Sequence, residues 1–433
     1  MTPLQIGLLG VGALLVLLCT SMPVAFAMIT TGVIGFSLIV TPHAAFNMVV
    51  SDVFNTFSSY NLTVIPLFVF MGQVAFHAGI SKRLFRSAYA WIGHLPGGLA
   101  MATVGACAGF GAICGSGPAT AATMTSVALP EMRRYKYSDE LASGTIAAGG
   151  SLGMLIPPSV VFIVYALMTE QSIGSLFLAG IIPGILIVGL FCLLIWFRCR
   201  VRKDLGPPGP KSSWRTRFRE LNGVIETVVL FLFVMGGMFL GLFTPIEAAA
   251  VGAGGSLVIA LIKRALTWAK LKQILLETVR TSAMVFFIVT GAVIFGRFLA
   301  VSQIPFVVAN WFTNLPLPGF LTMFLIIIFF LIAGCFIDAL ALILLTIPIF
   351  YPVITDLGFN PIWFGVMVVV ITQMGVITPP VGVNVYVVSG IERDIPLQSI
   401  FRGAIPFLFM LILAAVILIL FPQLSLWLPG LGG

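Results

Sequence analysis

Charged side chains are scarce in this sequence of 433 residues. Asp, Glu, Lys and Arg together make up 8% of it, whereas hydrophobic residues make up 60%. An ordinary soluble domain carries about 25% charged residues, so this chain has too little polar surface to cover a globule in water. The composition therefore excludes a water-soluble enzyme. It indicates a polytopic membrane protein whose long apolar segments are α-helices.

The residue patterns of metal sites and catalytic triads are also missing. The three histidines, His43, His77 and His94, lie far apart, and the six cysteines include no Cys-x-x-Cys pair. Neither a zinc site nor a Ser-His-Asp arrangement can be assembled from this spacing, and cysteines in or beside apolar segments are typical of small core residues. We therefore expect no enzymatic activity, no cofactor and no transition metal.

Positive charge is concentrated in one short segment. Eight of the 22 Lys and Arg residues lie between Arg198 and Arg219, in a Pro-rich loop between two long apolar blocks. Because cytoplasmic loops of membrane proteins carry an excess of Lys and Arg, this loop is predicted to be cytoplasmic, and nucleic-acid binding is not indicated. Contact with membrane lipid headgroups is an additional expected role.

Ten apolar segments approach or exceed the length of about 20 residues that a membrane span requires. They are 4–20, 22–40, 62–80, 141–168 and 176–197 before the basic loop, and 223–243, 246–262, 281–301, 361–389 and 400–421 after it. Two further stretches, 99–132 and 321–354, are too long for one straight span. Each is interrupted midway, at 115–118 and at 334–338, so each is predicted to be a re-entrant hairpin.

The charge distribution gives these spans a direction. With the basic loop inside, the outer stretches are 1–3, 41–61, 169–175, 244–245, 302–320, 355–360 and 422–433, and they contain no Lys or Arg. Only Arg297 lies near the outer end of a span. This bias predicts a multi-pass membrane protein with both termini on the outer side of the membrane.

The two halves of the chain resemble each other at a nearly constant offset. Residues 153–158 (GMLIPP) match residues 375–380 (GVITPP) at an offset of 222. Since each half holds five full spans, an odd number, the second half is expected to be inverted in the membrane. We therefore predict an inverted repeat of residues 1–197 and 223–433, joined by the loop 198–222.

The paired prolines predict two broken helices. A proline inside a helix removes a backbone donor and clashes with the preceding turn, so Pro157-Pro158 and Pro379-Pro380 should unwind the spans 141–168 and 361–389. Unwound backbone is tolerated in a membrane where it lines a cavity or binds a ligand, and its free carbonyls suit a sodium ion. The alternative is a packing kink in each helix.

The hairpin tips should face these breaks. The first tip is rich in small and hydroxyl residues, and the second carries Asp338, a carboxylate that is costly in a membrane unless it binds a cation or forms strong hydrogen bonds. Capping of the returning helix by Asp338 is the simpler alternative, and it is compatible with cation binding. The predicted sodium site 1 consists of Gly115, Ser116, Gly117, Gly153, Ile156 and Pro158. The predicted sodium site 2 consists of Gly334, Asp338, Gly375, Thr378 and Pro380.

A substrate site is predicted between the tips. Two inverted hairpin-and-break units bring hydroxyls, amides and helix N-termini together near the middle of the membrane, where they suit an anionic group. The predicted substrate-binding residues are Ser116, Thr120, Ser159, Thr378 and Asn384. Bound sodium would offset the negative charge of such an anionic group.

Two other polar residues have simpler explanations. Glu247 follows Pro245 at a helix start, where a carboxylate in the first turn is favoured by the helix dipole. Arg297 is expected to reach the headgroups or to pair with a carboxylate rather than to bind substrate.

Several longer motifs occur in an order that resembles one family. They are Gly111-Ala112-Ile113 before the Gly115-Ser116 tip, residues 156–159 (IPPS), 169–174 (TEQSIG), 179–184 (AGIIPG), 244–250 (TPIEAAA) and 377–382 (ITPPVG). Over its whole length the chain resembles the large membrane (M) subunit of tripartite ATP-independent periplasmic (TRAP) transporters, the DctM-like family of the ion-transporter superfamily.

This resemblance implies a sodium-driven symporter of the elevator type that imports a small carboxylate, such as sialic acid or a C4-dicarboxylate. It also implies a location in the bacterial cytoplasmic (inner) membrane, so that both termini would lie in the periplasm. It implies two partners: a periplasmic substrate-binding protein, and a small four-helix membrane subunit that we expect to be a separate chain. It also implies a scaffold formed by the first spans of each half, lateral arm helices near 47–60 and 266–280, and a moving unit of hairpins and broken helices.

Three alternatives remain from the sequence. A channel would need a wide polar pore lining, and an intramembrane enzyme would need a second carboxylate, a metal set or a nucleophile with its base. Within carriers, the alternative is a stand-alone sodium-coupled dicarboxylate or anion carrier of the same superfamily. The sequence does not name the carboxylate, because in this family the absent binding protein does most of the selection.

Overall fold

The structure is a computed structural model that describes residues 1–20, 22–313 and 318–431. The described residues form helices and connecting turns and contain no β-strand. The predicted outer stretches 302–320 and 422–433 lie partly outside the described residues. Seven helical segments in the described part are long and apolar enough to cross a membrane, in agreement with the expected polytopic membrane protein.

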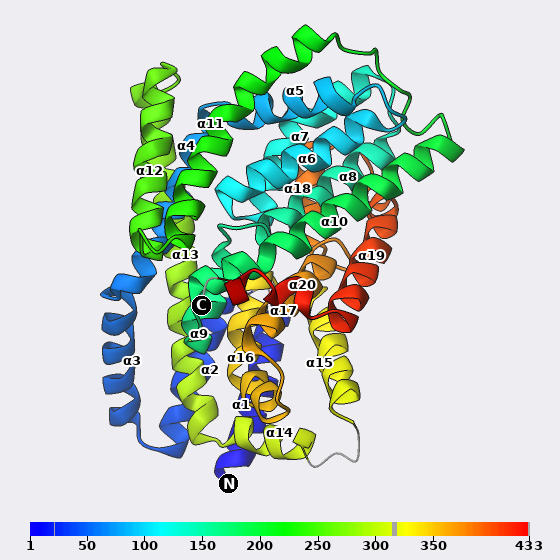
Figure 1. The fold of residues 1–433 in the computed structure, drawn as a ribbon. Helices are drawn as coiled ribbons and strands as arrows, with labels where there is room; N and C mark the ends of the chain where they lie inside the picture. The colour runs from blue at the N-terminus through cyan, green and yellow to red at the C-terminus, as the bar shows by residue number, and fades with distance from the viewer. Residues whose placement is uncertain (21, 314–317, 432–433) are drawn as a thin grey trace.

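One group of helices forms a steep layer at the left of Figure 1. We call α2 (Val24–Ile39), α4 (Val64–His77), α12 (Pro245–Ile262) and α13 (Trp268–Val301) the wall helices. Helix α2 packs on α13, and α4 packs on both α12 and α13. Small residues allow these close contacts: a Cβ atom on Gly291 would lie 2.8 Å from the carbonyl oxygen of Ala25.

Three helices border the wall. Helix α1 (Pro3–Cys19) packs on α2, α3 (Pro42–Phe57) packs on α2 and α13, and α11 (Trp214–Phe239) packs on α12. Helix α3 covers the arm expected near 47–60. The arm expected at 266–280 is not a separate helix, because α13 runs without interruption from Trp268 to Val301.

The remaining long helices form what we call the hairpin bundle, part of which is inclined at the upper right of Figure 1. Its first half comprises α6 (Gly98–Cys114), α7 (Gly117–Arg134), α8 (Asp139–Ser151), α9 (Val160–Thr169) and α10 (Ile173–Val201). Its second half comprises α15 (Gly319–Gly334), α16 (Ala339–Asp356), α17 (Pro361–Gly375), α18 (Val383–Ile391) and α19 (Leu397–Leu420). Helices α5 (Ile80–Ile92) and α14 (Ile304–Thr313) connect the wall to the two halves. The short helix α20 (Gln423–Leu426) follows α19.

Both predicted interruptions of each half are present. The chain turns between α6 and α7 and between α15 and α16, and the helix stops between α8 and α9 and between α17 and α18. The two Pro-Pro pairs lie in the latter breaks, where proline cannot donate the hydrogen bonds that a continuous helix requires. Short helical pieces therefore replace the two long spans predicted at 141–168 and 361–389.

The two halves of the hairpin bundle pack on each other reciprocally. Helix α7 packs on α18 while α16 packs on α9, and α8 packs on α19 while α10 packs on α17. The α8–α19 crossing is the tightest, because the backbones of Gly144 and Gly403 are in contact and leave no space for a Cβ atom on either residue. The two halves are thus packed into one body, and its buried side chains belong to a hydrophobic core that also includes residues of the wall helices.

Ion pairs join helix ends at one pole of the molecule. Glu226 of α11 bridges Arg83 and Lys263, and Arg133 of α7 pairs with both Asp139 and Glu392. These basic residues all fall in the segments that the charge pattern predicts to be cytoplasmic. These pairs place segment 82–94 near segment 263–280, and segment 131–139 near segment 391–402. The side of the membrane on which they lie stays a prediction.

The basic loop after α10 is fastened to the base of the first hairpin. The carbonyls of Leu205 and Gly206 accept hydrogen bonds from the N–H groups of Ser138 and Gly97, both at 3.0 Å. The N–H of Gly209 donates to the carbonyl of Gly93 at 2.9 Å. The first part of this loop thus belongs to the hairpin bundle, and only four residues separate the last of these bonds from α11.

Candidate functional site

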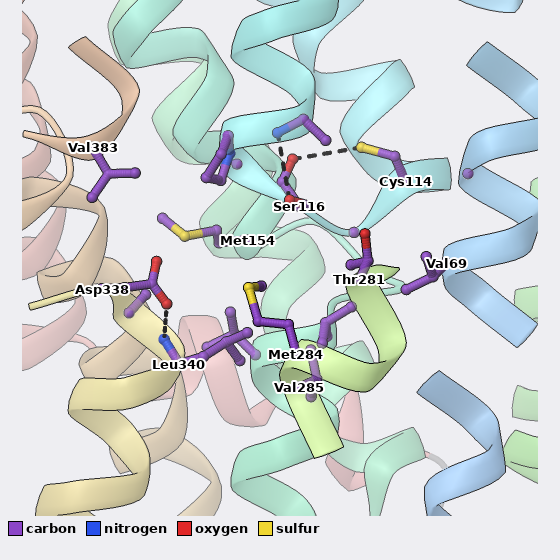
Figure 2. A pocket seen from close by; sticks show the side chains of 18 of the residues that line it. Val69, Cys114, Ser116, Met154, Thr281, Met284, Val285, Asp338, Leu340 and Val383 are labelled. Carbon is purple, nitrogen blue, oxygen red and sulfur yellow. Dashed lines mark hydrogen bonds between the residues drawn. The ribbon is translucent and has the colours of Figure 1, made fainter. Parts of the chain in front are cut away.

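A cavity of about 870 Å³ lies between the hairpin bundle and the wall helices. On one side it is lined by the tips of the two hairpins, and on the other by the beginning of α2, by α4 and by the first half of α13. Figure 2 shows Ser116 of the first tip and Asp338 of the second tip around this space, with Thr281 and Met284 of α13 beside them. The two tips therefore contribute to the same cavity, as the sequence predicted.

The first tip is shaped by one glycine and one serine. Helix α6 ends at Gly115, whose φ of 62° is in the left-handed region that favours glycine. Ser116 is extended and caps α7, since its Oγ accepts the N–H of Ala119 at 3.5 Å. The hydroxyl of Thr120 donates to the carbonyl of Ser116 at 2.8 Å, so Thr120 holds the tip from inside.

The break between α8 and α9 packs directly against this tip. The N–H of Val160 donates to the carbonyl of Gly115 at 3.3 Å, and a Cβ atom on Gly115 would lie 2.6 Å from the carbonyl oxygen of Pro158. A Cβ atom on Gly153 would lie 2.8 Å from the carbonyl oxygen of Ser116. Hairpin and break therefore meet through backbone atoms, which requires glycine at both contact points.

The second tip carries its carboxylate at the start of a helix. Oδ2 of Asp338 accepts the N–H of Leu340 at 3.1 Å and so caps α16, as in the simpler alternative given for this residue. Asp338 is half-buried and lines the cavity. A carboxylate at a helix N-terminus beside an apolar cavity keeps oxygen lone pairs free for a cation.

The second break is held in a similar way to the first. The N–H of Val381 donates to the carbonyl of Cys335 at 3.2 Å, and the backbone of Gly375 lies against Gly334. The hydroxyl of Thr378 donates to the carbonyl of Met374 at 2.6 Å. Each hairpin therefore accepts one backbone hydrogen bond from the segment that follows its facing Pro-Pro pair.

The residues predicted for sodium site 1 are close together. Gly115, Ser116, Gly153 and Pro158 meet through the contacts above, and Gly117 begins the returning helix α7. The carbonyls of Ile156 and Pro158 accept no hydrogen bond from the described residues. For site 2, Gly334 and Gly375 are in contact, Asp338 lies at the tip of the same hairpin, and Pro380 is exposed. Sodium binding at either place stays a prediction.

The residues predicted for substrate binding do not all line the cavity. Ser116 does. Thr120 and Ser159 are fully buried, and their hydroxyls donate to the carbonyls of Ser116 and Met154. Asn384 is also fully buried, and its Nδ2 donates to the carbonyl of Ala147 in α8 at 3.0 Å. Thr378 is half-buried and is bound to Met374.

The residues on the wall side of the cavity were not predicted from the sequence. Gln73 of α4 and Glu277, Thr281 and Met284 of α13 line it, and Met154 approaches from the first break. Asp338 and Glu277 are the acidic residues in this lining, and no Lys, Arg or His side chain of the described part of the chain belongs to it. No local sequence signal marks these wall residues, because their exposure to the cavity depends on how the hairpin bundle docks.

Glu247 and Arg297 each have a partner that fits the simpler explanation given for them from the sequence. The carboxylate of Glu247 accepts the N–H of Thr244 at 2.8 Å in a capping box at the start of α12. Arg297 pairs with Asp52 of α3, with Nη2 and Oδ1 3.4 Å apart. Neither residue lines the cavity.

Comparison with known proteins gives a match over nearly the whole chain. Residues 11–424 match the family described as the tripartite ATP-independent periplasmic transporter, DctM component. The chain is 38% identical over 378 residues to the C4-dicarboxylate TRAP transporter large permease protein DctM of Pseudomonas aeruginosa, covering 87% of this chain and 88% of that protein. It is 35% identical to the sialic acid TRAP transporter large permease protein SiaM of Vibrio cholerae, covering 96% of each.

A further relative and a solved structure extend the comparison. The ectoine/5-hydroxyectoine TRAP transporter large permease protein UehC of Ruegeria pomeroyi is 30% identical, covering 96% of this chain and 97% of that protein. The YdaH transporter of Alcanivorax borkumensis has a similar structure, with a TM-score of 0.60 over 88% of this chain and 89% of that one at 15% identity. This second likeness concerns the fold alone.

Proposed function

The chain belongs to the DctM component family of tripartite ATP-independent periplasmic transporters, and from this membership we propose that it imports a small carboxylate by sodium-coupled symport. It is a membrane-embedded large permease subunit rather than an enzyme. The observation that carries the proposal is the cavity shared by the two hairpin tips, with Asp338 at its edge. Its substrate is a carboxylate, as the names of the DctM and SiaM relatives suggest.

Two sodium sites are proposed where the hairpins meet the breaks. Gly115, Ser116 and the carbonyls of Ile156 and Pro158 would hold one ion, with Gly117 and Gly153 shaping the site. Asp338 and Thr378, with the backbone of Gly334, Gly375 and Pro380, would hold the other. Unpaired carbonyls and a carboxylate are the hard oxygen ligands that suit an alkali cation beside half-helix ends. The substrate carboxylate would bind near Ser116, with its charge offset by the two ions.

The inverted repeat supplies the proposed mechanism. The offset of 222 residues between the Pro-Pro breaks and the reciprocal packing of α7 on α18 and α16 on α9 support two inverted halves, 1–197 and 223–433. In this proposal the wall helices are the scaffold, and the hairpin bundle moves past them as a rigid elevator. The close packing of the two bundle halves on each other supports movement of the bundle as one body.

The cavity in this structure is proposed to open inward. From the tips it extends along α13 to Glu277 and along α18 to Ile391, which lie towards the pole where the ion pairs join the basic helix ends. That pole is predicted to be cytoplasmic. The structure would then correspond to the state that releases substrate inside the cell.

Two partners complete the proposed system in the bacterial inner membrane. A periplasmic binding protein would deliver the substrate, and a small four-helix subunit on a separate chain would brace the wall. The apolar face of α3, where Phe46, Val50 and Phe54 are exposed, offers a lateral surface for such a subunit or for lipid.

Reconstitution tests the proposal directly. The chain and its small subunit in proteoliposomes, with an inward sodium gradient and a ligand-loaded binding protein, should take up radiolabelled succinate or N-acetylneuraminate. Uptake should stop when potassium replaces sodium or when the binding protein is omitted. Sodium-dependent uptake without the binding protein would indicate a stand-alone carrier instead, and uptake independent of sodium would contradict the coupling.

A further inference from the structure

We propose that Glu277 makes the inner part of the cavity repel anions, so that a carboxylate substrate leaves it rapidly towards the predicted cytoplasmic end. This inference rests on the proposed function, because it takes the cavity to be the inward-opening path of a carboxylate. It adds a role for a residue on the wall, outside the predicted sodium and substrate sites.

Glu277 is the acidic residue on the wall side of the cavity, opposite the hairpin tip that carries Asp338. It lies in the first half of α13, is half-buried, and lines the cavity one helical turn before Thr281. Its Oε1 accepts a hydrogen bond from Nε2 of Gln273 at 2.8 Å. This bond orients the carboxylate without neutralising it, since the amide of Gln273 carries no charge.

No positive charge of the described residues is paired with Glu277. Lys270, Lys272 and Arg280 lie on the same helix, but they are exposed, do not line the cavity, and form no ion pair with Glu277 within 4 Å. The other charged residue of the lining, Asp338, is also acidic. The lining thus carries negative charge without a compensating cation of its own.

The apolar lining of the cavity strengthens the repulsion between Glu277 and an anion. Much of the lining is apolar, with Phe26, Phe76, Phe287 and Met284 among its residues. Charges beside low-polarity walls interact more strongly than charges in bulk water. A bound carboxylate is stabilised while sodium occupies the hairpin tips. After sodium leaves, the carboxylate faces the negative charge of Asp338 and then that of Glu277 along its exit.

Glu277 would change the rate of substrate release and the affinity for substrate on the inner side. It would not change the final level to which substrate accumulates. The sodium and substrate gradients fix the equilibrium, and a catalyst cannot shift it. A carboxylate on the fixed wall acts only where the hairpin tips are displaced towards it. It would therefore weaken rebinding of substrate from the inside and leave binding from the outside unchanged.

The potential in the cavity can be measured without knowing the substrate. Ser126 of α7 is exposed and lines the same cavity. We would introduce Ser126→Cys into the full complex in inside-out membrane vesicles. The vesicles would be treated with an anionic reagent, sulfonatoethyl methanethiosulfonate, or a cationic one, trimethylammonioethyl methanethiosulfonate. Modification rates at position 126 would be measured by mass spectrometry.

Glu277→Gln should raise the ratio of the anionic to the cationic rate by roughly five- to tenfold, as expected for loss of one nearby charge. The matched control is Glu220→Gln, which removes a carboxylate from α11 that does not line the cavity and should leave the ratio unchanged. An unchanged ratio in Glu277→Gln, or an equal rise in both variants, would overturn the inference. If position 126 reacts with neither reagent from the cytoplasmic side, the inward-opening cavity of the proposed function fails first.

Discussion

Arg297 of α13 and Asp52 of α3 form an ion pair in which the two partners differ greatly in burial. Nη2 of Arg297 lies 3.4 Å from Oδ1 of Asp52, and the side chains are 61% and 4% exposed, respectively. The second oxygen of Asp52 is buried without a hydrogen-bond partner among the described residues. Helix α3 is thus held to the wall by a carboxylate that has a charged partner on only one of its two oxygens.

Because Asp52 is buried and Arg297 is exposed, removing each partner is expected to lower the free energy of unfolding by a different amount. Arg297→Gln leaves a buried carboxylate without a cation and should destabilise the protein by about 2 kcal/mol. This cost is smaller than that of breaking a fully buried ion pair, because Arg297 is largely exposed. Asp52→Asn should cost less, since the freed guanidinium can reach water or headgroups. Thermal unfolding of the purified variants measures both effects. The double variant should be more stable than Arg297→Gln alone, and a less stable double variant would contradict this account.

Asp338→Asn should weaken binding of the coupling sodium ion without destabilising the fold. The amide can still accept the N–H of Leu340 as a helix cap, but it lacks the charge that would attract sodium. We expect the sodium concentration for half-maximal uptake to rise at least tenfold, measured in proteoliposomes. Asp356→Asn, at the exposed end of the same helix, is the matched control and should behave as the wild type. Unchanged sodium activation in Asp338→Asn would remove Asp338 from the proposed site.

Ser116→Ala and Asn384→Ala should affect different properties. Ser116 lines the cavity, so its loss should raise the substrate concentration for half-maximal uptake, in addition to a capping cost of about 1 kcal/mol. Asn384 binds Ala147 inside the hairpin bundle, so its replacement should mainly lower the unfolding temperature. Uptake curves and thermal unfolding of the same preparations separate the two outcomes. Normal substrate saturation in Ser116→Ala would place the substrate elsewhere in the cavity.

Gly144→Ala should be severely destabilising. A methyl group on Gly144 would overlap the backbone of Gly403 at the α8–α19 crossing, and backbone atoms cannot rotate away. We expect a loss of at least about 3 kcal/mol, the upper part of the range for overpacking. Gly254→Ala in α12 is the control, since nothing lies within 4 Å of the added atom. Equal unfolding temperatures of the two variants would contradict the tight crossing.

Cysteine labelling can establish the orientation of the chain. Pro208→Cys lies in the basic loop and Asn55→Cys in α3, which the charge pattern places on opposite sides of the membrane. In whole cells, with exposed Cys19 replaced by serine in both variants, a membrane-impermeant maleimide should label position 55 and spare position 208. Inside-out vesicles should give the reverse. Labelling of both from the same side would break the predicted topology.

The interruptions of the helices could be predicted because their causes are local. Proline removes a backbone donor wherever it lies in a helix, and glycine permits the left-handed turn at Gly115 whatever surrounds it. The same holds for Asp338 and Glu247, whose capping roles follow from their position at helix starts. The short sequence motifs therefore predicted both hairpins, both breaks and the two capping carboxylates.

The orientation of individual side chains could not be predicted in this way. Asn384 lies one residue after Val383, which lines the cavity, yet its amide points into the bundle to Ala147. Glu277 lay in a segment expected to be a separate arm helix, but α13 continues through it and carries it to the cavity. Both differences arise from how helices distant in the sequence dock on one another, and apolar segments without clear periodicity contain little information about this docking.

The fastening of the basic loop limits how far the hairpin bundle could travel relative to α11. Beyond the bond between Gly209 and Gly93, only residues 210–213 remain before α11 begins at Trp214. Fully extended, the five steps from residue 209 to residue 214 span about 18 Å. The linker therefore acts as a tether of fixed reach. A displacement of its anchor beyond that reach would have to break the backbone bonds at Gly97, Ser138 and Gly93 or unwind the first turn of α11.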